Sequence, residues 1–428
     1  MTGAPKIYTT QTDLLRELLD HAKTRSTWHR ERLQGVDPAT FRVADLDSLP
    51  TMKKGDVNEH FDEISTEPRL TRSWCESHLQ QGNPYTDGTF CVIASGGTSG
   101  HRTVQVYTAQ AAAGVIGLGS RMDIRHMIRT GVTPAPGKVV WIAAAPGGAH
   151  ATDVFARLGG GLTDGQRFAV TDPVGDVIAG LNEIQPAIIM LYSSYLKQLI
   201  QAQSDGRLSI APSQLALTSE TPSPADMAKA QEIWNCSISS SWASVEFGVM
   251  GRSSFFQEGH LLSDDLLLIE AVDEHGRPVQ PDTQAPKLLI TNLYNRSMPL
   301  IRYELTDQLT IYSWPADCGS CLRAASLVSG RLDDHFVYDG GTPVHSHLFR
   351  HVLEQRPGIL EYQVRQTRDG ATVSLVAGGA VDPVDIGATL ERDLERTGVP
   401  SPRVNIRLVP SIERTTAQKL KRFIALQE

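Results

Sequence analysis

Helix and strand signals alternate along the middle of the chain, and this alternation limits the folds open to it. Residues 139–143 and 187–191 are short apolar runs with the length and β-branched content of buried strands. Residues 109–129, 175–184 and 194–203 have helical spacing. Alternation of this kind predicts an α/β fold with a largely parallel sheet flanked by helices.

The pattern differs on either side of this region. Residues 1–90 look helical and irregular, with apolar side chains at helical spacing over 11–34. From about residue 261 the strands 266–270 and 287–291, joined by a turn-rich segment, predict a small antiparallel β subdomain.

After Gly330 the sequence predicts a short α+β unit. Its helices cover about 345–355 and 382–397, and its strands cover about 371–377 and 404–408. We therefore predict two domains, an N-terminal core over 1–331 and a mobile C-terminal domain over 332–428.

Composition excludes several classes of protein. With 428 residues, 40% hydrophobic, and a formal net charge of −8, the chain is typical of globular proteins and lacks the basic stretches that bind nucleic acid. No apolar run is long enough to span a membrane, and the N-terminus has no signal core. Five scattered cysteines favour a cytoplasmic location.

Residues 93–108 read IASGGTSGHRTVQVYT, and their first half has the composition of a phosphate-binding loop. Glycines let backbone N–H groups approach anionic oxygens, and hydroxyl groups add donors. The residues concerned are Ser95, Gly96, Gly97, Thr98, Ser99 and Gly100. Many phosphate loops continue with a lysine where this one has His101. Alone, the segment predicts either a phosphate loop or an ordinary turn.

Four further segments stand in a fixed order after this loop: 241–251 (SWASVEFGVMG), 296–307 (RSMPLIRYELTD), 329–334 (SGRLDD) and 413–423 (ERTTAQKLKRF). Together with the loop they resemble the motifs of the adenylate-forming superfamily of acyl-CoA synthetases, NRPS adenylation domains and luciferases. The resemblance spans about residues 90–423, and the match is to the phenylacetate–CoA ligase branch. Five motifs in order carry more weight than any one of them.

The resemblance implies roles around the ATP phosphates. The loop Ser95–Gly100 would cradle them, and Glu246 would hold Mg²⁺, a hard cation that prefers oxygen ligands. Asp307 would bind the ribose hydroxyls, and Arg331 would contact ribose or phosphate. Arg302 and Tyr303 would lie beside the nucleotide. Read without the resemblance, Glu246 is a surface or capping glutamate and Asp307 a turn residue.

On the adenine side, the resemblance implies that Ser219, Glu220 and Thr221 lie near the base. Trp242 stands where the family has a tyrosine that stacks on adenine, and an indole stacks as well as a phenol. The alternative is a tryptophan buried in the core.

The resemblance assigns Lys419 to the position between the α-phosphate and the substrate carboxylate. A cation there stabilises the charge that develops when two anions react. Lys421 is the other candidate for this role. The alternative interpretation of the segment is a solvated basic tail with no catalytic role. Asp333 matches the hinge about which the small domain would rotate, exchanging Lys419 for the loop Gly340-Gly341.

An acid pocket is implied around residues 146–150 and 192–195. Its members would be Gly147, Gly148, His150, Tyr192 and Ala243. The small residues would leave room for the ring of an aromatic acid. His150 either contacts the acid or is a histidine with no role in the site.

Several positions depart from the family pattern. Val245 replaces a hydroxyl residue, Ala243, Thr306 and Gln418 replace glycines, and Ala316 replaces a cysteine of a segment that binds zinc in some members. His260, Cys318 and Cys321 remain as a weak zinc set, but a closed site needs four ligands, so free cysteines are favoured.

The resemblance implies an ATP-dependent ligase with ATP, Mg²⁺ and coenzyme A as cofactors. It would convert a small aromatic carboxylic acid to acyl-AMP with release of pyrophosphate, and then transfer the acyl group to a thiol. The acceptor alternatives are a carrier protein, an amine or another small nucleophile. A non-catalytic nucleotide-binding protein is the second alternative. A homodimer is suggested by the resemblance alone.

Overall fold

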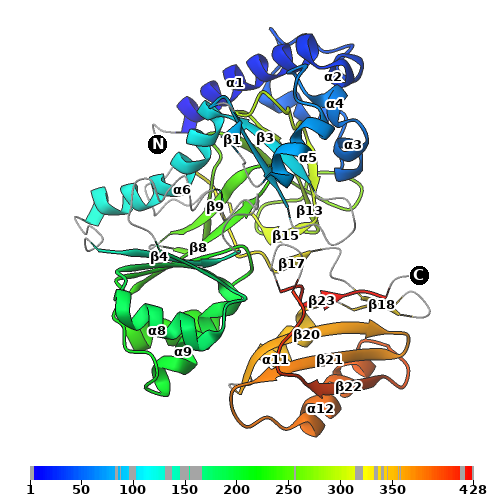
Figure 1. Ribbon diagram of the computed structural model, residues 1–428. Coiled ribbons are helices and arrows are strands. Elements are labelled where there is room, and N and C mark those ends of the chain that lie inside the picture. The colour runs from blue at the N-terminus through cyan, green and yellow to red at the C-terminus, as the bar shows by residue number, and fades with distance from the viewer. Residues whose placement is uncertain are drawn as a thin grey trace. The chain divides into compact units, whose positions relative to one another are not determined.

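The computed structural model describes residues 4–81, 85–86, 88–95, 103–130, 137–144, 154, 166–254, 257–313, 322–331, 336–338, 342–344, 346–354, 356, 358–414 and 420–426. The chain divides into two compact units (Figure 1). Unit 1 comprises Met1–Pro134, Ala144–Gly165 and Ser239–Leu327, and unit 2 comprises Ala135–Ala143, Gln166–Ile238 and Val328–Glu428.

Unit 1 begins with helices, drawn blue in Figure 1. They are α1 (Ala4–Arg25), α2 (Thr27–Arg32), the 3₁₀ helix η1 (Val43–Ser48), α3 (Lys54–Glu59), α4 (Phe61–Ile64) and α5 (Arg72–Gln80). Leu15, Leu18 and Leu19 form the buried stripe that the sequence predicted on α1. The periodic stretch 11–34 is nevertheless two helices, because the Ser26 side chain accepts the backbone N–H of His29 and starts α2.

The rest of unit 1 is mainly antiparallel. The strands β1 (Tyr85–Thr86), β2 (Phe90–Ala94) and β3 (Val104–Thr108) form one sheet, followed by α6 (Ala109–Thr130). A hairpin of β8 (Ser237–Ser244) and β9 (Gly248–Ser254) continues into β10 (Gln257–Leu262) and β16 (Ala324–Ala325).

The predicted antiparallel pair near residue 270 is confirmed. Here β11 (Leu267–Val272) pairs with β13 (Lys287–Asn292), and Ile269 faces Ile290. Next to β13 lies β14 (Tyr303–Leu305), and a separate ribbon joins β12 (Gln284–Ala285) to β15 (Asp307–Thr310).

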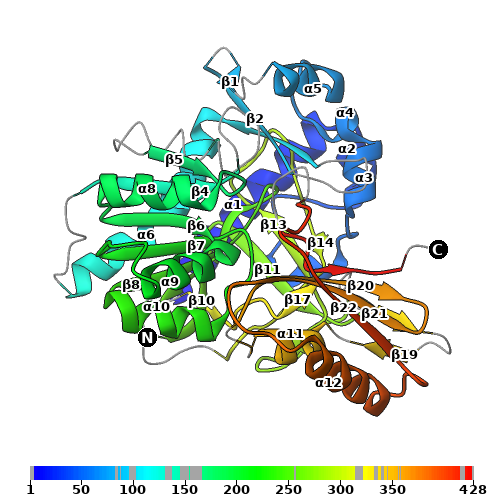
Figure 2. The same cartoon turned by 60° about the horizontal axis from the view of Figure 1, so that its bottom comes forward.

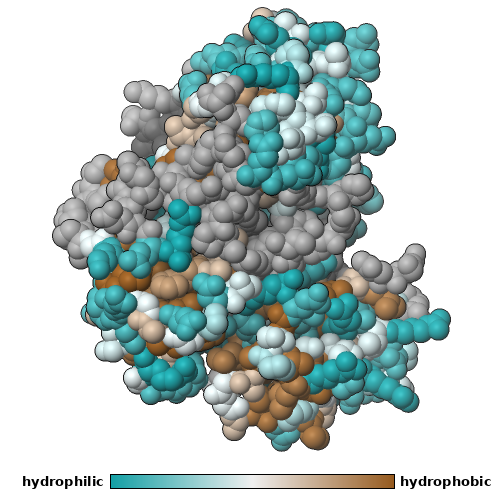
Figure 3. Space-filling view, in the orientation of Figure 1, coloured by the Kyte–Doolittle hydropathy of each residue, from teal (hydrophilic) through white to brown (hydrophobic). Residues whose placement is uncertain are grey.

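Figure 3 shows polar side chains over the face that the N-terminal helices present.

Unit 2 contains the predicted parallel sheet. Its strands are β4 (Val139–Ala143), β5 (Gln166–Ala169), β6 (Ile188–Tyr192) and β7 (Gln214–Thr218), in the order β7-β6-β4-β5. All three pairings between them are parallel. The connecting helices are α8 (Val174–Ile184), α9 (Leu196–Ser204), which follows the 3₁₀ turn η2 (Ser193–Tyr195), and α10 (Pro224–Trp234). Figure 1 places α8 and α9 together on one side of this sheet.

The C-terminal part of unit 2 has its own core. The sheet β22-β21-β20-β23 comprises β20 (Ile359–Thr367), β21 (Gly370–Ala377), β22 (Arg403–Leu408) and β23 (Phe423–Ile424). Figure 2 shows α11 (His347–Glu354) and α12 (Pro383–Arg396) on one face of it. Short strands β17 (Gly330–Arg331), β18 (Phe336–Tyr338) and β19 (Thr342–Val344) precede α11. Phe336, Phe349, Leu390 and Phe423 belong to the core between these elements.

The α/β fold class is confirmed, and so are the predicted C-terminal helices and strands within a few residues. The strand β20, the longest of the C-terminal sheet, was not predicted from the sequence. The predicted boundary near residue 331 stays a prediction, and 332–335 lie outside the described residues. Among the helices that the structure describes, none has both the length and the apolar character needed to cross a membrane.

Candidate active site

The predicted phosphate loop connects two paired strands. In the β2–β3 pair, Ala94 faces Val104. One residue further on, the Ser95 N–H donates to the Thr103 carbonyl (2.8 Å) and the Thr103 N–H donates to Ser95 Oγ (3.0 Å). These two bonds fix the base of the connection. Gly96, Gly97, Thr98, Ser99, Gly100 and His101 lie outside the described residues.

Glu246 lies at the tip of the β8–β9 hairpin. Ser244 Oγ accepts the backbone N–H of Phe247 (3.2 Å), and Gly248 has a φ of 60°. A side chain is disfavoured at that φ, and a Cβ on Gly248 would lie 2.8 Å from Val115 Cγ1. The glycine therefore allows the tight turn that presents Glu246, whose side chain is half-buried.

Four side chains hold three consecutive carbonyls of this tip. Tyr107 Oη donates to Val245 O (2.6 Å), and Tyr294 Oη donates to Phe247 O (3.0 Å). The Glu246 carbonyl between them accepts from Gln105 Nε2 (3.5 Å) and from Asn292 Nδ2 (3.3 Å). Burial raises the pKa of Tyr107 and Tyr294 well above their usual value of 10, so both remain neutral donors. These four residues were not predicted from the sequence, although Gln105 is a polar residue in an otherwise apolar strand and was a signal.

Val245 has a structural reason to lack a hydroxyl. Its side chain is buried in an apolar cluster with Ile93, Tyr107 and Val115. A hydroxyl residue there would need a hydrogen-bond partner within that cluster. The departure from the family pattern at this position is therefore explained by packing.

The Glu246 carboxylate meets a residue of the next motif. Tyr303, buried on β14, places its hydroxyl 3.4 Å from Glu246 Oε1. Within the described residues, no group of three or more His, Cys, Asp or Glu side chains could hold a metal ion. One half-buried carboxylate fits Mg²⁺ when phosphate oxygens and water supply the other ligands, as is usual for this ion.

Trp242 and Asp307 also come together. The indole Nε1 of Trp242 donates to Asp307 Oδ2 (3.1 Å), and both side chains are buried. The hydrogen bond orients the indole beside the predicted ribose carboxylate. Stacking of Trp242 on adenine stays a prediction. Ala243 is the next residue of β8 and is exposed.

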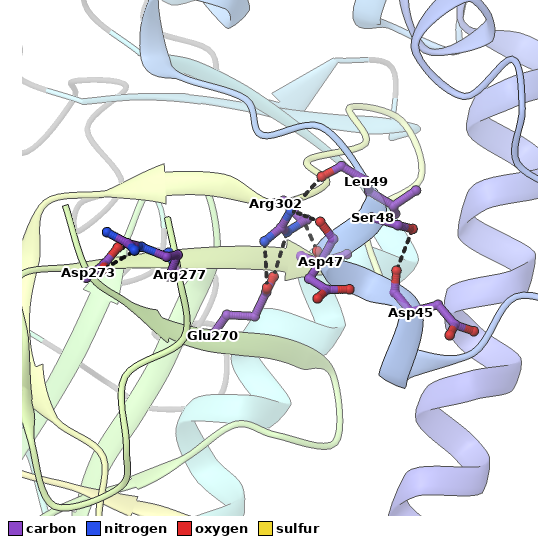
Figure 4. A network of polar contacts seen from close by, with 9 residues as sticks. Asp45, Asp47, Ser48, Leu49, Glu270, Asp273, Arg277 and Arg302 are labelled. Atoms are coloured by element: carbon purple, nitrogen blue, oxygen red, sulfur yellow. Dashed lines mark hydrogen bonds and ion pairs between the residues drawn. The ribbon is translucent and has the colours of Figure 1, made fainter. Parts of the chain in front are cut away.

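Arg302 is bound by protein groups (Figure 4). Its guanidinium donates to both carboxylate oxygens of Glu270 (3.1 and 2.9 Å) and to the carbonyls of Asp47 (3.0 Å) and Leu49 (2.5 Å). Burial raises the pKa of Glu270, and the adjacent Arg302 charge counteracts this. These contacts link the N-terminal segment to β11 and β14. A nucleotide contact by Arg302 stays a prediction.

The predicted adenine-side turn begins where β7 ends. Ser219 has a φ of 70°, in the left-handed region, and the Glu220 carbonyl accepts the Ser193 hydroxyl (2.8 Å). Glu220 Oε2 accepts the backbone N–H of Ser194 (2.8 Å). Tyr192, predicted for the acid pocket, is fully buried at the end of β6. Ser219, Glu220 and Thr221 are each half-buried.

His260, the described member of the predicted zinc set, is buried on β10 with Nε2 3.0 Å from Ser240 Oγ. Burial lowers its pKa from 6.5 to about 4, so the ring is neutral. Several predicted residues lie outside the described ones: Gly147, Gly148, His150, Cys318, Cys321, Asp333, Gly340, Gly341 and Lys419. Arg331 is described only in its backbone, on β17.

The chain is similar to known proteins in its sequence and in its fold. No protein-family model matches the chain. Phenylacetate-coenzyme A ligase of Thermus thermophilus is 25% identical over 389 residues, which are 85% of this chain and 79% of that protein.

Solved structures share the fold. The 2-hydroxyisobutyryl-CoA ligase in its postadenylation state with R3-HIB-AMP has a TM-score of 0.73 at 18% identity, covering 97% of this chain and 88% of that one. The anthranilate CoA ligase AuaEII with anthranoyl-AMP has a TM-score of 0.54 at 13% identity, covering 78% and 66%. The chain is therefore similar in sequence to a phenylacetate–coenzyme A ligase and shares its fold with these two acyl-CoA ligases.

Proposed function

We propose that the protein activates a small aromatic carboxylic acid as acyl-AMP and transfers the acyl group to coenzyme A. The observation that carries this proposal is the pairing of two motifs that are separate in the sequence. Glu246 contacts Tyr303, and Trp242 contacts Asp307. Residues that the resemblance assigns to metal, ribose and base are thus neighbours in unit 1.

The chemistry proceeds in two steps. A carboxylate oxygen of the acid attacks the α-phosphorus of ATP, and the bond to the bridging oxygen breaks to release pyrophosphate. Mg²⁺, when bound, offsets phosphate charge. Glu246 would provide it with an oxygen ligand, Asp307 would accept from the ribose hydroxyls, and Lys419 would stabilise the charge between the reacting groups. A thiolate then attacks the acyl carbon, and AMP leaves.

An aromatic acid is supported by the names of two relatives, which act on phenylacetate and anthranilate. Coenzyme A as acceptor is supported by the same names. A carrier protein, an amine or another small nucleophile stays an alternative acceptor. The complete reaction run with each acceptor, with the product weighed by mass spectrometry, distinguishes them.

Acid-dependent ATP–pyrophosphate exchange across a set of aryl acids tests the first step. We expect exchange with at least one acid, and its loss in Lys419→Ala and Glu246→Gln. If the folded protein binds ATP yet shows no exchange with any acid, it is a non-catalytic nucleotide-binding protein and the proposal is wrong.

A further inference from the structure

Glu220 has a carboxylate shared between two distant segments of unit 2. Oε2 accepts the backbone N–H of Ser194 (2.8 Å), at the turn before α9. Oε1 accepts the backbone N–H of Leu420 (3.1 Å), 200 residues further along the chain. The Ser193 hydroxyl fixes the backbone of Glu220 at the same time (2.8 Å). The resemblance implies that Glu220 lies near adenine, and it does not predict these contacts.

The chain after Leu420 is also anchored. The Lys421 carbonyl accepts from Gln363 Nε2 (3.0 Å), and the Arg422 carbonyl accepts the Val364 N–H (2.7 Å). β23 then pairs with β20. Leu420 itself is buried. The Glu220 contact therefore ties the parallel-sheet part of unit 2 to a segment that β20 already holds.

Before residues 415–419 the chain has a second anchor. Arg414 forms an ion pair with Glu361, and Glu361 Oε1 also accepts from Gln198 Nε2 on α9 (2.9 Å). The Arg414 and Glu361 side chains are only 11% and 6% exposed. A buried ion pair is costly to break on one side, so this anchor is strong.

We propose that Glu220 is a positioning residue that fixes the backbone at Leu420 and so sets the reach of Lys419 in the first half-reaction. Lys419 directly precedes Leu420 in the sequence, so the N–H that Glu220 holds belongs to the peptide group that joins these two residues. A carboxylate suits the role, because it has lone pairs for two N–H donors and bonds to a charged acceptor are the stronger ones. This inference rests on the proposed function for Lys419.

The contact has a consequence for the two half-reactions. Under the proposed function, Lys419 is needed to form acyl-AMP, so that step should depend on the contact. Thiol transfer, in which Lys419 is exchanged for another loop, does not need it. Loss of Glu220 should therefore slow the first half-reaction selectively, whereas general damage to the fold would slow both.

The first test is hydrogen exchange of the Leu420 amide in the full chain, resolved to single residues. We expect Glu220→Ala and Glu220→Gln to accelerate that exchange about tenfold or more, because a charge-assisted hydrogen bond is removed. Glu232→Ala is the matched control, since Glu232 is exposed on α10 and pairs with Lys229. Equal Leu420 exchange in wild type and both Glu220 variants overturns the proposal.

The second test separates the half-reactions with phenylacetate as the probe acid. We expect Glu220→Gln to lower ATP–pyrophosphate exchange about tenfold or more, and to lower the conversion of synthetic phenylacetyl-AMP and coenzyme A by a much smaller factor. Equal losses in both steps overturn the positioning role. If wild type itself shows no exchange with any aryl acid, the proposed function fails, while Leu420 amide exchange still decides whether Glu220 holds the segment.

Discussion

Replacing Arg302 tests whether this residue of the MPLIRYELTD motif serves the fold. Arg302→Met keeps a side chain about as long as the aliphatic part of arginine and removes the guanidinium. It leaves Glu270 without its bidentate partner and frees the carbonyls of Asp47 and Leu49 (Figure 4). The Arg302 and Glu270 side chains are 6% and 20% exposed, so water reaches the orphaned charge poorly.

Removing one partner of such a buried pair costs about 3–5 kcal/mol. With a urea dependence of roughly 3 kcal/mol per M, the midpoint of the transition that reports on unit 1 should fall by more than about 1 M. Glu270→Gln in the same chain should restore part of this loss, because it removes the unpaired buried charge.

Urea unfolding followed by tryptophan fluorescence measures the change. Arg277→Met is the matched control, since Arg277 pairs with Asp273 in an exposed turn of the same subdomain, and it should leave the midpoint unchanged. An unchanged midpoint in Arg302→Met together with abolished ATP binding would refute the structural role and support a nucleotide contact.

Three further changes probe other parts of unit 1. Tyr107→Phe removes the 2.6 Å bond to the Val245 carbonyl. It should cost about 1 kcal/mol and raise the Mg²⁺ concentration for half-maximal exchange; an unchanged Mg²⁺ titration would contradict this. Gly248→Ala adds a Cβ at a φ of 60°, and a loss of about 2–4 kcal/mol should appear as a lower thermal midpoint. The pKa of buried His29 is lowered from 6.5 to about 4 by desolvation. The unfolded chain therefore binds the proton more readily, so stability is full above pH 6.5 and falls by about 3 kcal/mol toward pH 4. In His29→Gln the midpoint of urea unfolding should change less between pH 7.5 and pH 4.5 than it does in the wild type. The same dependence on pH in both proteins would contradict this prediction.

The elements of the fold were largely predictable because their signals are local. The antiparallel pair β11–β13, the parallel strands β4 and β6, and the helix α12 follow from the periodicity of adjacent residues. The strand β20 was missed although its residues alternate. It contains Glu361, which is buried because Arg414 and Gln198 pair with it, a contact that no local pattern reveals.

The order of helices and strands, the change from parallel to antiparallel structure and the order of the five motifs could all be predicted from the amino-acid sequence. Which residues of the motifs contact one another depends on the folded structure. Trp242 reaches Asp307 across 65 residues, Glu246 reaches Tyr303 across 57, and Glu220 reaches the Leu420 amide across 200. The contact between Arg302 and Glu270 likewise appears only in the folded structure. Spacing along the chain reports the direction of neighbouring side chains, whereas contacts over such separations depend on how strands pair and sheets pack.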